Sequence, residues 1–398
     1  MSSILLFKEA VMIYLDNGAT SFPKPKGMLQ AMEECMTKYC GNPGRSGHVM
    51  SMKTGEKVYQ ARRQVAEFLG IDDGERLLFT KNATEALNLG IKGVLREGDG
   101  VITTSMEHNS VLRPLRELEK KGVKTFIVEG RKDGFVSPQE IERKIKPNTR
   151  LIVITAASNV TGTKMPIKEI GEIASKRRIL FLVDGAQGAG SMKLDIGKMN
   201  IDMFAFPGHK GLLGPLGTGG LYVRKGIALE PLLTGGTGTE SKSRVHPREF
   251  PEGYEAGTIN APAIIGLGKS VEYLNKIGVD VIEKYEREII EYLDNCLDEM
   301  DFITKYGPDA KGKTGMTLFN FDGITAEELT AKLSGEYGIA VRGGYHCAGL
   351  AHRTIGTWNT GGVRVSVSPF TSKLQVDALV EALWDMGKKG QKNFFKPI

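Results

Sequence analysis

The feature that most constrains the fold is a series of short apolar runs separated by helical patterns. From residue 77 onward the runs are RLLFT, GVITT, KTFIVEG, RLIVITAAS, ILFLVDGAQ, IDMFAFPG and GGLYV. Helical patterns lie between several of them, as at residues 83–98 and 166–178. Strands that alternate with helices form a largely parallel sheet with helices on both faces, and near-continuous apolar runs such as LIVIT fit strands buried on both sides. We therefore predict an α/β fold.

The pattern changes near residue 260, which predicts a second, smaller domain. A long helical stretch covers residues 262–300, and the strand-like runs MTLFNFDG and RVSVSPF follow it. A capping box at residues 325–328 and a last helix after Thr371 complete an α+β pattern. A chain of 398 residues is long enough for two domains. We expect an N-terminal segment (1–30) that packs with the small domain, a large α/β domain (31–261) and a small α+β domain (262–398).

Charge and composition exclude several classes of function. The net charge of +6 is spread along the chain, and the longest basic block is KKGQK near its end, so we expect no nucleic acid partner. No apolar run reaches the ~18–20 residues of a membrane span, and residues 1–11 are a poor signal peptide that we interpret as a dispensable extension. Four cysteines without ligand spacing predict neither disulfides nor a metal site, and they favour a cytoplasmic location.

Polar side chains follow five of the predicted strands, at the point where each strand ends. They are the Lys81–Glu85 segment, whose Thr84 lies at a predicted helix N-terminus, then His108, Asn159, the pair Asp184 and Gln187, and His209 with Lys210. Lys210 lies at the centre of the Gly- and Pro-rich stretch 206-FPGHKGLLGPLGTGG-220, which contains no carboxylate. Because ligand sites in open α/β sheets lie beyond the carboxyl ends of the strands, we expect these groups to converge on one edge.

Each of these residues has an ordinary explanation when it is taken singly. A helix cap, a packed surface histidine, a polar turn, a paired aspartate and a solvated lysine are all common. Five coincidences at consecutive strand ends are better explained together: an anion site, an imidazole, an amide, a carboxylate and an unpaired lysine that converge on one edge. These are the partners that pyridoxal 5′-phosphate requires, with its lysine Schiff base and its aspartate on the pyridine nitrogen.

The motifs of the chain also resemble those of a known family. The stretches YLDNGATSFPKP, FTKNATEALN, SMEHNSVL, ASNVTGT, LVDGAQGAG, FPGHKGLLGPLGTGGLYV, YEAGTIN and VRGGYHCAG are similar to the class V aminotransferase family of fold-type I pyridoxal phosphate enzymes. Within it they most resemble the group II, SUF-type cysteine desulfurases and selenocysteine lyases, from about Tyr14 to Phe370. The resemblance implies a mostly parallel seven-stranded sheet flanked by helices, with a smaller C-terminal domain.

The resemblance assigns roles to the residues at the strand ends. Lys210 would be the Schiff-base lysine and His108 would stack on the cofactor ring, and with Cys347 they form the implied catalytic set. The other cofactor contacts that the resemblance implies are Asp184 at the ring nitrogen, Gln187 at the ring hydroxyl, Ala83, Thr84 and His209 at the phosphate, and Asn159 at the cofactor or substrate. The family forms homodimers in which Thr258 would reach the phosphate of the partner subunit.

Three further residues bear on the reaction that the resemblance implies. Arg364 would grip the substrate α-carboxylate, for which a planar guanidinium suits bidentate pairing, and Asn159 and Arg342 would assist. Cys347 would accept sulfur from L-cysteine as a persulfide and leave L-alanine, with Arg342 and His346 favouring its thiolate. L-Selenocysteine is a second candidate substrate, and a separate acceptor protein is expected to take the persulfide.

Some positions depart from the family pattern and keep an alternative open. Pro207 replaces a common phosphate-binding serine, Gly44 a frequent histidine, and Tyr345 a second histidine of the SUF type. The alternative is another class V enzyme, an aminotransferase or a C–S lyase, in which Cys347 is not catalytic.

Overall fold

The structure, a computed structural model, describes residues 12–44 and 47–394, so the predicted extension at residues 1–11 lies outside the described residues. Its centre is a seven-stranded sheet in the order β2-β8-β7-β6-β5-β3-β4. The strands are β2 (Leu77–Thr80), β3 (Gly100–Thr104), β4 (Lys124–Val128), β5 (Thr149–Thr155), β6 (Leu180–Asp184), β7 (Met203–Pro207) and β8 (Gly219–Val223). All neighbours pair in parallel except β8, which is antiparallel to both β2 and β7. The predicted α/β fold with a mostly parallel seven-stranded sheet is confirmed.

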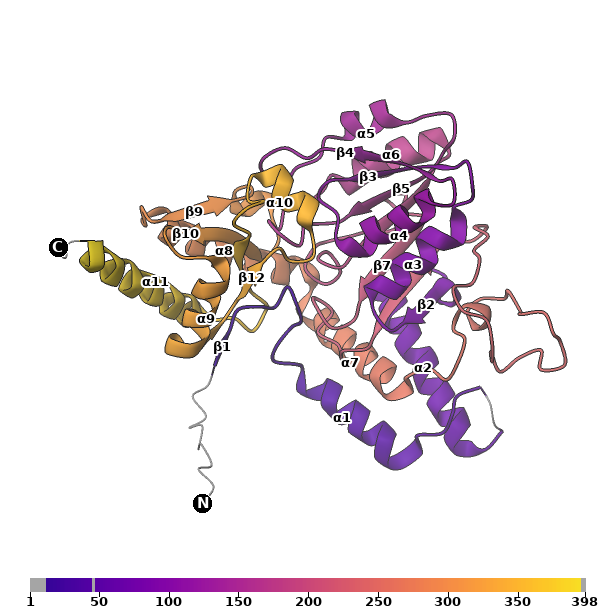
Figure 1. The fold of residues 1–398 in the computed structure, drawn as a ribbon. Coiled ribbons are helices and arrows are strands. Elements are labelled where there is room, and N and C mark those ends of the chain that lie inside the picture. The colour runs from indigo at the N-terminus through magenta and orange to yellow at the C-terminus, as the bar shows by residue number, and fades with distance from the viewer. Residues whose placement is uncertain (1–11, 45–46, 395–398) are drawn as a thin grey trace, which may run out of the picture.

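Helices cover both faces of this sheet (Figure 1). They are α1 (Lys26–Glu34), α2 (Val49–Phe68), α3 (Ala83–Val94), α4 (Asn109–Glu119), α5 (Pro138–Lys144), α6 (Ile167–Arg177) and α7 (Ala261–Ile277). The strands alternate their side chains between two cores: Leu182 packs with α3 and α4 residues, whereas its neighbour Phe181 packs with residues of α2, α6 and α7. This explains why β5 and β6 are apolar at nearly every position.

A second, four-stranded antiparallel sheet lies toward the C-terminus, in the order β12-β13-β10-β9. Its strands are β9 (Ile303–Tyr306), β10 (Met316–Phe321), β12 (Arg342–Gly344) and β13 (Gly362–Ser366). The helices of this part are α8 (Val279–Asp298), α9 (Ala326–Tyr337), α10 (Gly349–Ile355) and α11 (Lys373–Phe394). The capping box predicted at residues 325–328 is present, with Thr325 and Glu328 bonded reciprocally.

The N-terminal segment pairs with the C-terminal part of the chain, in a separate two-stranded sheet, and not with the large sheet. Strand β1 (Ile13–Tyr14) pairs in parallel with β11 (Ile339–Ala340), and Asp16 bridges to Ser366. Leu15 is fully buried in the apolar cluster formed by α8, α9, α11 and the small sheet. From there the chain crosses to α1, so residues 16–25 run between the two sheets (Figure 1). No helix among the described residues is long and apolar enough to cross a membrane.

Candidate active site

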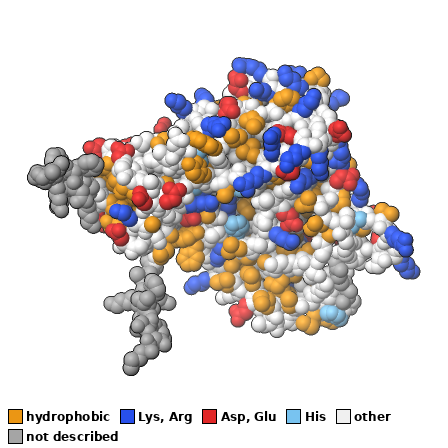
Figure 2. Space-filling model, viewed as in Figure 1, with side chains coloured by type: hydrophobic (Ala, Val, Ile, Leu, Met, Phe, Trp, Pro, Cys, Tyr) orange, Lys and Arg blue, Asp and Glu red, His pale blue; other side chains and the backbone are white. Residues whose placement is uncertain are grey.

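The carboxyl ends of β5, β6 and β7 bring the predicted strand-end residues to one cavity of about 500 Å³. Its walls include eight of them: Ala83, Thr84, His108, Asn159, Asp184, Gln187, His209 and Lys210. The face that carries this edge is rich in Lys and Arg side chains, which gather across its middle near α4 (Figure 2). A basic surface of this kind attracts anionic ligands.

Lys210 lies in the tight turn that follows β7. The turn depends on Gly208, because a Cβ there would collide with the Thr218 side chain. The pKa of the Lys210 amine is lowered to about 8, chiefly by burial. The nearby Arg364 guanidinium also lowers this pKa, by more than the Asp184 carboxylate raises it. The amine therefore has a substantial neutral fraction near neutral pH, as a nucleophile that attacks an aldehyde requires.

Asp184 is the last residue of β6 and is 2% exposed. Its Oδ1 accepts a hydrogen bond from the Ala186 N–H at 2.9 Å. Burial nevertheless raises the pKa of its carboxyl, and this outweighs the Ala186 bond and the Lys210 charge. A buried carboxyl group whose pKa is raised in this way is stabilised in its ionised form by a cationic partner. A protonated pyridine nitrogen would be such a partner.

His108 caps the N-terminus of α4 and joins a short hydrogen-bond chain. Its Nδ1 accepts from the Ser110 N–H at 3.0 Å and lies 2.8 Å from the Ser110 hydroxyl, which in turn lies 2.8 Å from the Thr84 hydroxyl. Burial, with the Lys210 charge next in size, lowers the pKa of His108 to about 4. The imidazole is thus neutral and held in one orientation, which suits stacking on an aromatic ring.

The other end of the cavity is an anion site built on α3. Asn82 caps this helix by accepting from the Glu85 N–H, and Ala83 and Thr84 form the first turn. Helix N-termini bind phosphate because their first N–H groups have no partner within the helix. His209 Nδ1 is buried without a hydrogen-bond partner among the described residues, which indicates a place for an oxygen ligand. The residues present therefore fit pyridoxal 5′-phosphate.

The N-terminal segment closes the cavity from the side of the small sheet. Gln187 Nε2 donates to the Gly18 carbonyl at 3.0 Å, so its amide oxygen remains free for a ligand. Lys24 donates to the His209 carbonyl at 2.9 Å, and burial lowers the pKa of its amine to about 8. These contacts connect the N-terminal segment to Gln187 and to the turn that carries Lys210.

Arg364 lies at 1% exposure on β13, next to this cavity. Its Nη1 donates to the Asn159 carbonyl at 2.7 Å and its Nη2 to Asp16 Oδ1 at 2.9 Å. Its Nε is buried and has no hydrogen-bond partner among the described residues. The guanidinium therefore keeps donors for a further carboxylate, although Asp16 already neutralises part of its charge.

Cys347 is exposed in the loop between β12 and α10. Its Sγ lies 3.7 Å from Arg342 Nη2. Two hydrogen bonds attach the loop to the large sheet: the Asn109 N–H donates to the Cys347 carbonyl at 2.8 Å, and Asn159 Nδ2 donates to the His346 carbonyl at 2.6 Å. The backbone of this loop is thereby attached beside His108 and Asn159, two residues of the cavity wall, and the exposed thiol lies beside a guanidinium.

The expectation that His346 favours the thiolate finds no support in this geometry. Its Nε2 contacts the Arg342 carbonyl at 3.1 Å and its Nδ1 lies 3.3 Å from His352 Nε2. Burial lowers the pKa of His346 well below its usual range, so the ring carries no charge. Arg342 is the group that can favour the thiolate.

Thr258 lies apart from this cavity. It is exposed, in the loop that precedes α7, and it is not among the residues that line the Lys210 cavity. Thr258 is therefore not placed to bind a phosphate in the cavity of its own chain.

The family model for aminotransferase class-V matches residues 13–379. The chain belongs to that family. It is 37% identical over 385 residues to a probable cysteine desulfurase of Methanothermobacter thermautotrophicus, with 95% of each chain covered, and 35% identical to one of Pyrococcus abyssi, with 94% of each covered. The cysteine desulfurase of Thermococcus onnurineus superposes with a TM-score of 0.90 at 35% identity, covering 95% of each chain.

Membership of this family confirms the predicted resemblance and the cofactor, pyridoxal 5′-phosphate. The narrower assignment to the SUF-type branch stays a prediction. The structure also adds class V site residues that the motifs did not indicate: Ser110, which links Thr84 to His108, Lys24, and Asp16 on Arg364. The position of Ser110 two residues after a helix-capping histidine was a usable local signal. Lys24 and Asp16 lie in the quoted stretch YLDNGATSFPKP, but nothing near them indicates their partners, which are distant in the sequence.

Proposed function

We propose that this class V enzyme is a cysteine desulfurase in which Cys347 receives the substrate sulfur. The single observation that supports this most strongly is the position of the exposed Cys347 thiol, attached through its own backbone to the helix that His108 caps. The relatives described as cysteine desulfurases cover nearly the whole chain and support the same activity. In the overall reaction L-cysteine and the Cys347 thiol give L-alanine and a Cys347 persulfide.

The cofactor would be held by the residues that surround it in the cavity. Thr84, Ala83 and His209 would bind its phosphate, His108 would cover its ring, and Asp184 would hold a proton at its ring nitrogen. When bound, pyridoxal 5′-phosphate supplies an electron sink for negative charge at the substrate Cα. Gln187 would donate to or accept from the ring hydroxyl.

The remaining residues would bind the amino acid and move its protons. Arg364, Asn159 and Arg342 would hold the α-carboxylate, with the buried Arg364 Nε as one donor. The Lys210 amine, whose pKa is lowered to about 8, would take the Cα proton and return a proton to carbon. The Cys347 thiolate, beside Arg342, would attack the substrate sulfur and break its bond to Cβ.

We further propose L-selenocysteine as a second substrate and a thiol-bearing acceptor protein as the destination of the persulfide sulfur. A homodimer is proposed because Thr258 does not line its own cavity and because the stretch from α1 through α2 carries exposed apolar side chains. These are Leu29, Met36, Val49, Met50, Met52 and Tyr59. The domain division at residues 30 and 261 and a reducing, cytoplasmic location, suited to four free cysteines, are likewise proposals.

The test compares wild type with Cys347→Ala and with Cys296→Ala, a free cysteine on α8, as the matched control. Alanine release from L-cysteine should fall by at least 100-fold in Cys347→Ala and stay within about twofold of wild type in Cys296→Ala, because sulfur transfer is the step removed. Labelled sulfur from L-cysteine should appear on the wild-type protein and on Cys296→Ala, and it should be absent from Cys347→Ala. Full alanine release by Cys347→Ala would favour the alternative, a class V enzyme in which this cysteine is incidental.

A further inference from the structure

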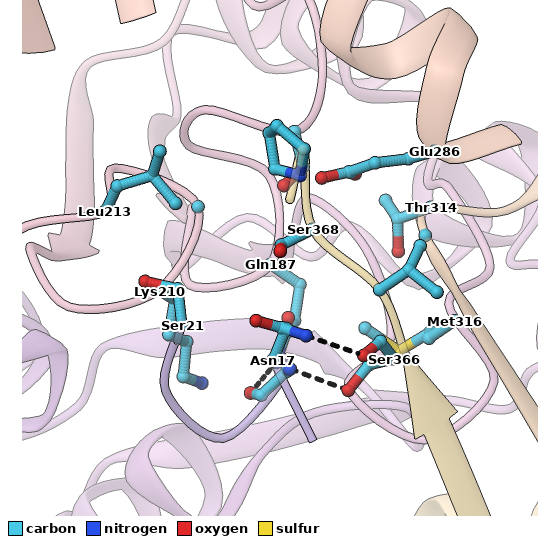
Figure 3. Close-up of a pocket in the computed structure, with 16 residues that line it drawn as sticks. Asn17, Ser21, Gln187, Lys210, Leu213, Glu286, Thr314, Met316, Ser366 and Ser368 are labelled. Atoms are coloured by element: carbon cyan, nitrogen blue, oxygen red, sulfur yellow. Dashed lines mark hydrogen bonds between the residues drawn. The ribbon is translucent and has the colours of Figure 1, made fainter. Parts of the chain in front are cut away.

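A second cavity, here called the Glu286 chamber, shares Lys210 and Gln187 with the cofactor cavity as wall residues. It occupies about 400 Å³ between the N-terminal segment, α8 and the connection that enters β10. Its remaining polar wall consists mostly of hydroxyl and amide side chains: Asn17, Ser21, Ser191, Thr314, Ser366 and Ser368. Figure 3 shows Glu286 extending from α8 into this space, with Lys210 and Leu213 on the opposite side.

Glu286 is a buried acid without a partner. It is 4% exposed, and within the described part of the chain its carboxyl forms neither a hydrogen bond nor an ion pair. It packs closely against the backbone of Gly315, where a Cβ would lie 2.9 Å from Oε2. Buried carboxyl groups almost always have a partner, so this one indicates a ligand that faces it from the chamber.

The charged side chains around Glu286 do not neutralise it. Lys164 is the cation whose charge lowers the pKa of Glu286, but its amine already pairs with Glu283 at 2.6 Å. Lys193 pairs with Asp280 at 2.7 Å on the same helix, and the amine of Lys210 is largely neutral above its lowered pKa. Burial, with the Glu283 charge next in size, consequently raises the pKa of Glu286 to about 8.

We propose that the Glu286 chamber binds a monovalent cation such as K⁺, held by the Glu286 carboxylate and by neutral oxygens of Ser191, Thr314 and Ser368. All of these ligands are oxygens, which hard cations prefer. A divalent ion is less suited, because Ca²⁺ and Mg²⁺ sites combine several carboxylates and the described wall of the chamber offers one. No group of three or more His, Cys, Asp or Glu side chains among the described residues could hold a metal ion.

Binding of the cation would displace the Glu286 proton, and this coupling makes the site recognisable. The apparent affinity for K⁺ should rise about tenfold per pH unit up to pH ~8 and change little above it, because the carboxylate is the binding form. This cation site is independent of the proposed desulfurase reaction, and it is tested by thermal stability and proton release and not by turnover. A failure of one proposal therefore leaves the other intact.

The experiment measures the Tm of the holoenzyme at pH 8.5 in KCl and in choline chloride of equal ionic strength. Saturating K⁺ should raise the Tm by about 2–4 °C in wild type. The gain should disappear in Glu286→Gln and persist in Glu291→Gln, which changes an exposed glutamate on the same helix. At pH 6.5 the wild-type gain should shrink, and NaCl and NH₄Cl arms define the ion preference.

Proton release gives a second measurement that needs no variant. Addition of KCl to weakly buffered wild type at pH 7.5 should release a fraction of one proton per chain, and choline chloride should release none. Equal Tm values in K⁺, Na⁺, NH₄⁺ and choline, or an undiminished K⁺ gain in Glu286→Gln, would overturn the proposal. A chamber that holds only water and a protonated Glu286 predicts equal values in all four salts.

Discussion

The Asn109 N–H donates a hydrogen bond of 2.8 Å to the carbonyl of Cys347. Asn109 is the first residue of α4, directly after His108, whereas Cys347 belongs to the loop between the small sheet and α10. One bond thus joins the backbone of Cys347 to the residue that follows His108, the side chain proposed to cover the cofactor ring. The backbone at His346 and Cys347 adopts left-handed φ values of 52° and 59°, so the loop has a specific, constrained shape.

This anchoring leads to a first prediction, for Asn159→Ala. The substitution removes the buried bond from Nδ2 to the His346 carbonyl, which is worth about 1–3 kcal/mol when lost. We expect persulfide formation on Cys347 to slow by ~10-fold or more while the cofactor absorbance stays near that of wild type. Asn148→Ala, which removes a comparable side-chain bond to Gly98 at the far edge of the sheet, should leave the rate unchanged. Equal rates in both variants would contradict the anchoring role.

The second prediction concerns Asp184→Asn. An amide keeps the size of the side chain but cannot hold a proton on the ring nitrogen by charge, and a charge-assisted hydrogen bond contributes about 1.5–3 kcal/mol. We expect kcat to fall by ~10–100-fold with a smaller effect on cofactor retention. The matched control is Asp202→Asn, since Asp202 accepts from the Phe181 N–H at the opposite end of the same strands. That variant should lose stability but keep its turnover per folded molecule.

The third prediction is the pH dependence of cofactor incorporation into cofactor-free protein. The pKa of Lys210 is lowered to about 8, so its neutral, reactive form increases with pH and reaches half at about pH 8. The rate of imine absorbance growth should therefore level off about two units lower than for a free lysine, whose pKa is about 10.4. Arg364→Met removes a positive neighbour and should move the midpoint upward. A midpoint near pH 10 in wild type would refute the assigned environment.

The fourth prediction concerns stability and pH at Glu107. This side chain is fully buried beside the site, accepts from the Thr104 hydroxyl at 2.7 Å, and has a pKa raised to about 8 by burial. A raised pKa means that the folded state binds the Glu107 proton more tightly than the unfolded state does. The contribution of this proton to the free energy of unfolding is therefore complete below the unfolded pKa of ~4.5, and it is lost as pH rises through about 8.

Glu107→Gln should flatten this dependence, because the amide resembles the neutral acid. Urea unfolding at pH 6 and pH 9 should show a smaller loss of unfolding free energy in the variant, by about a few kcal/mol at most. The exposed Glu117→Gln on α4 serves as the control and should follow wild type. Parallel curves for Glu107→Gln and wild type would show that Glu107 is not the titrating group.

The sequence by itself determined the large sheet and the residues at its carboxyl edge. Runs such as LIVIT and LFLVD must form buried parallel strands, because only such strands are apolar at successive positions, and that rule places Asp184 and Lys210 at one edge. The capping box at Thr325 could also be predicted from the sequence, because its two partners, Thr325 and Glu328, are only three residues apart.

Only the tertiary structure decided which groups complete the site from a distance. The pairing of Arg364 with Asp16 spans 348 residues, and the bond from Asn109 to Cys347 joins the two sheets. His346 was expected beside the thiol but is turned toward His352, and Glu286 reaches the site region from α8. Local spacing carries no information on such contacts, because the packing of whole helices and sheets, and not the order of neighbouring residues, determines which side chains meet.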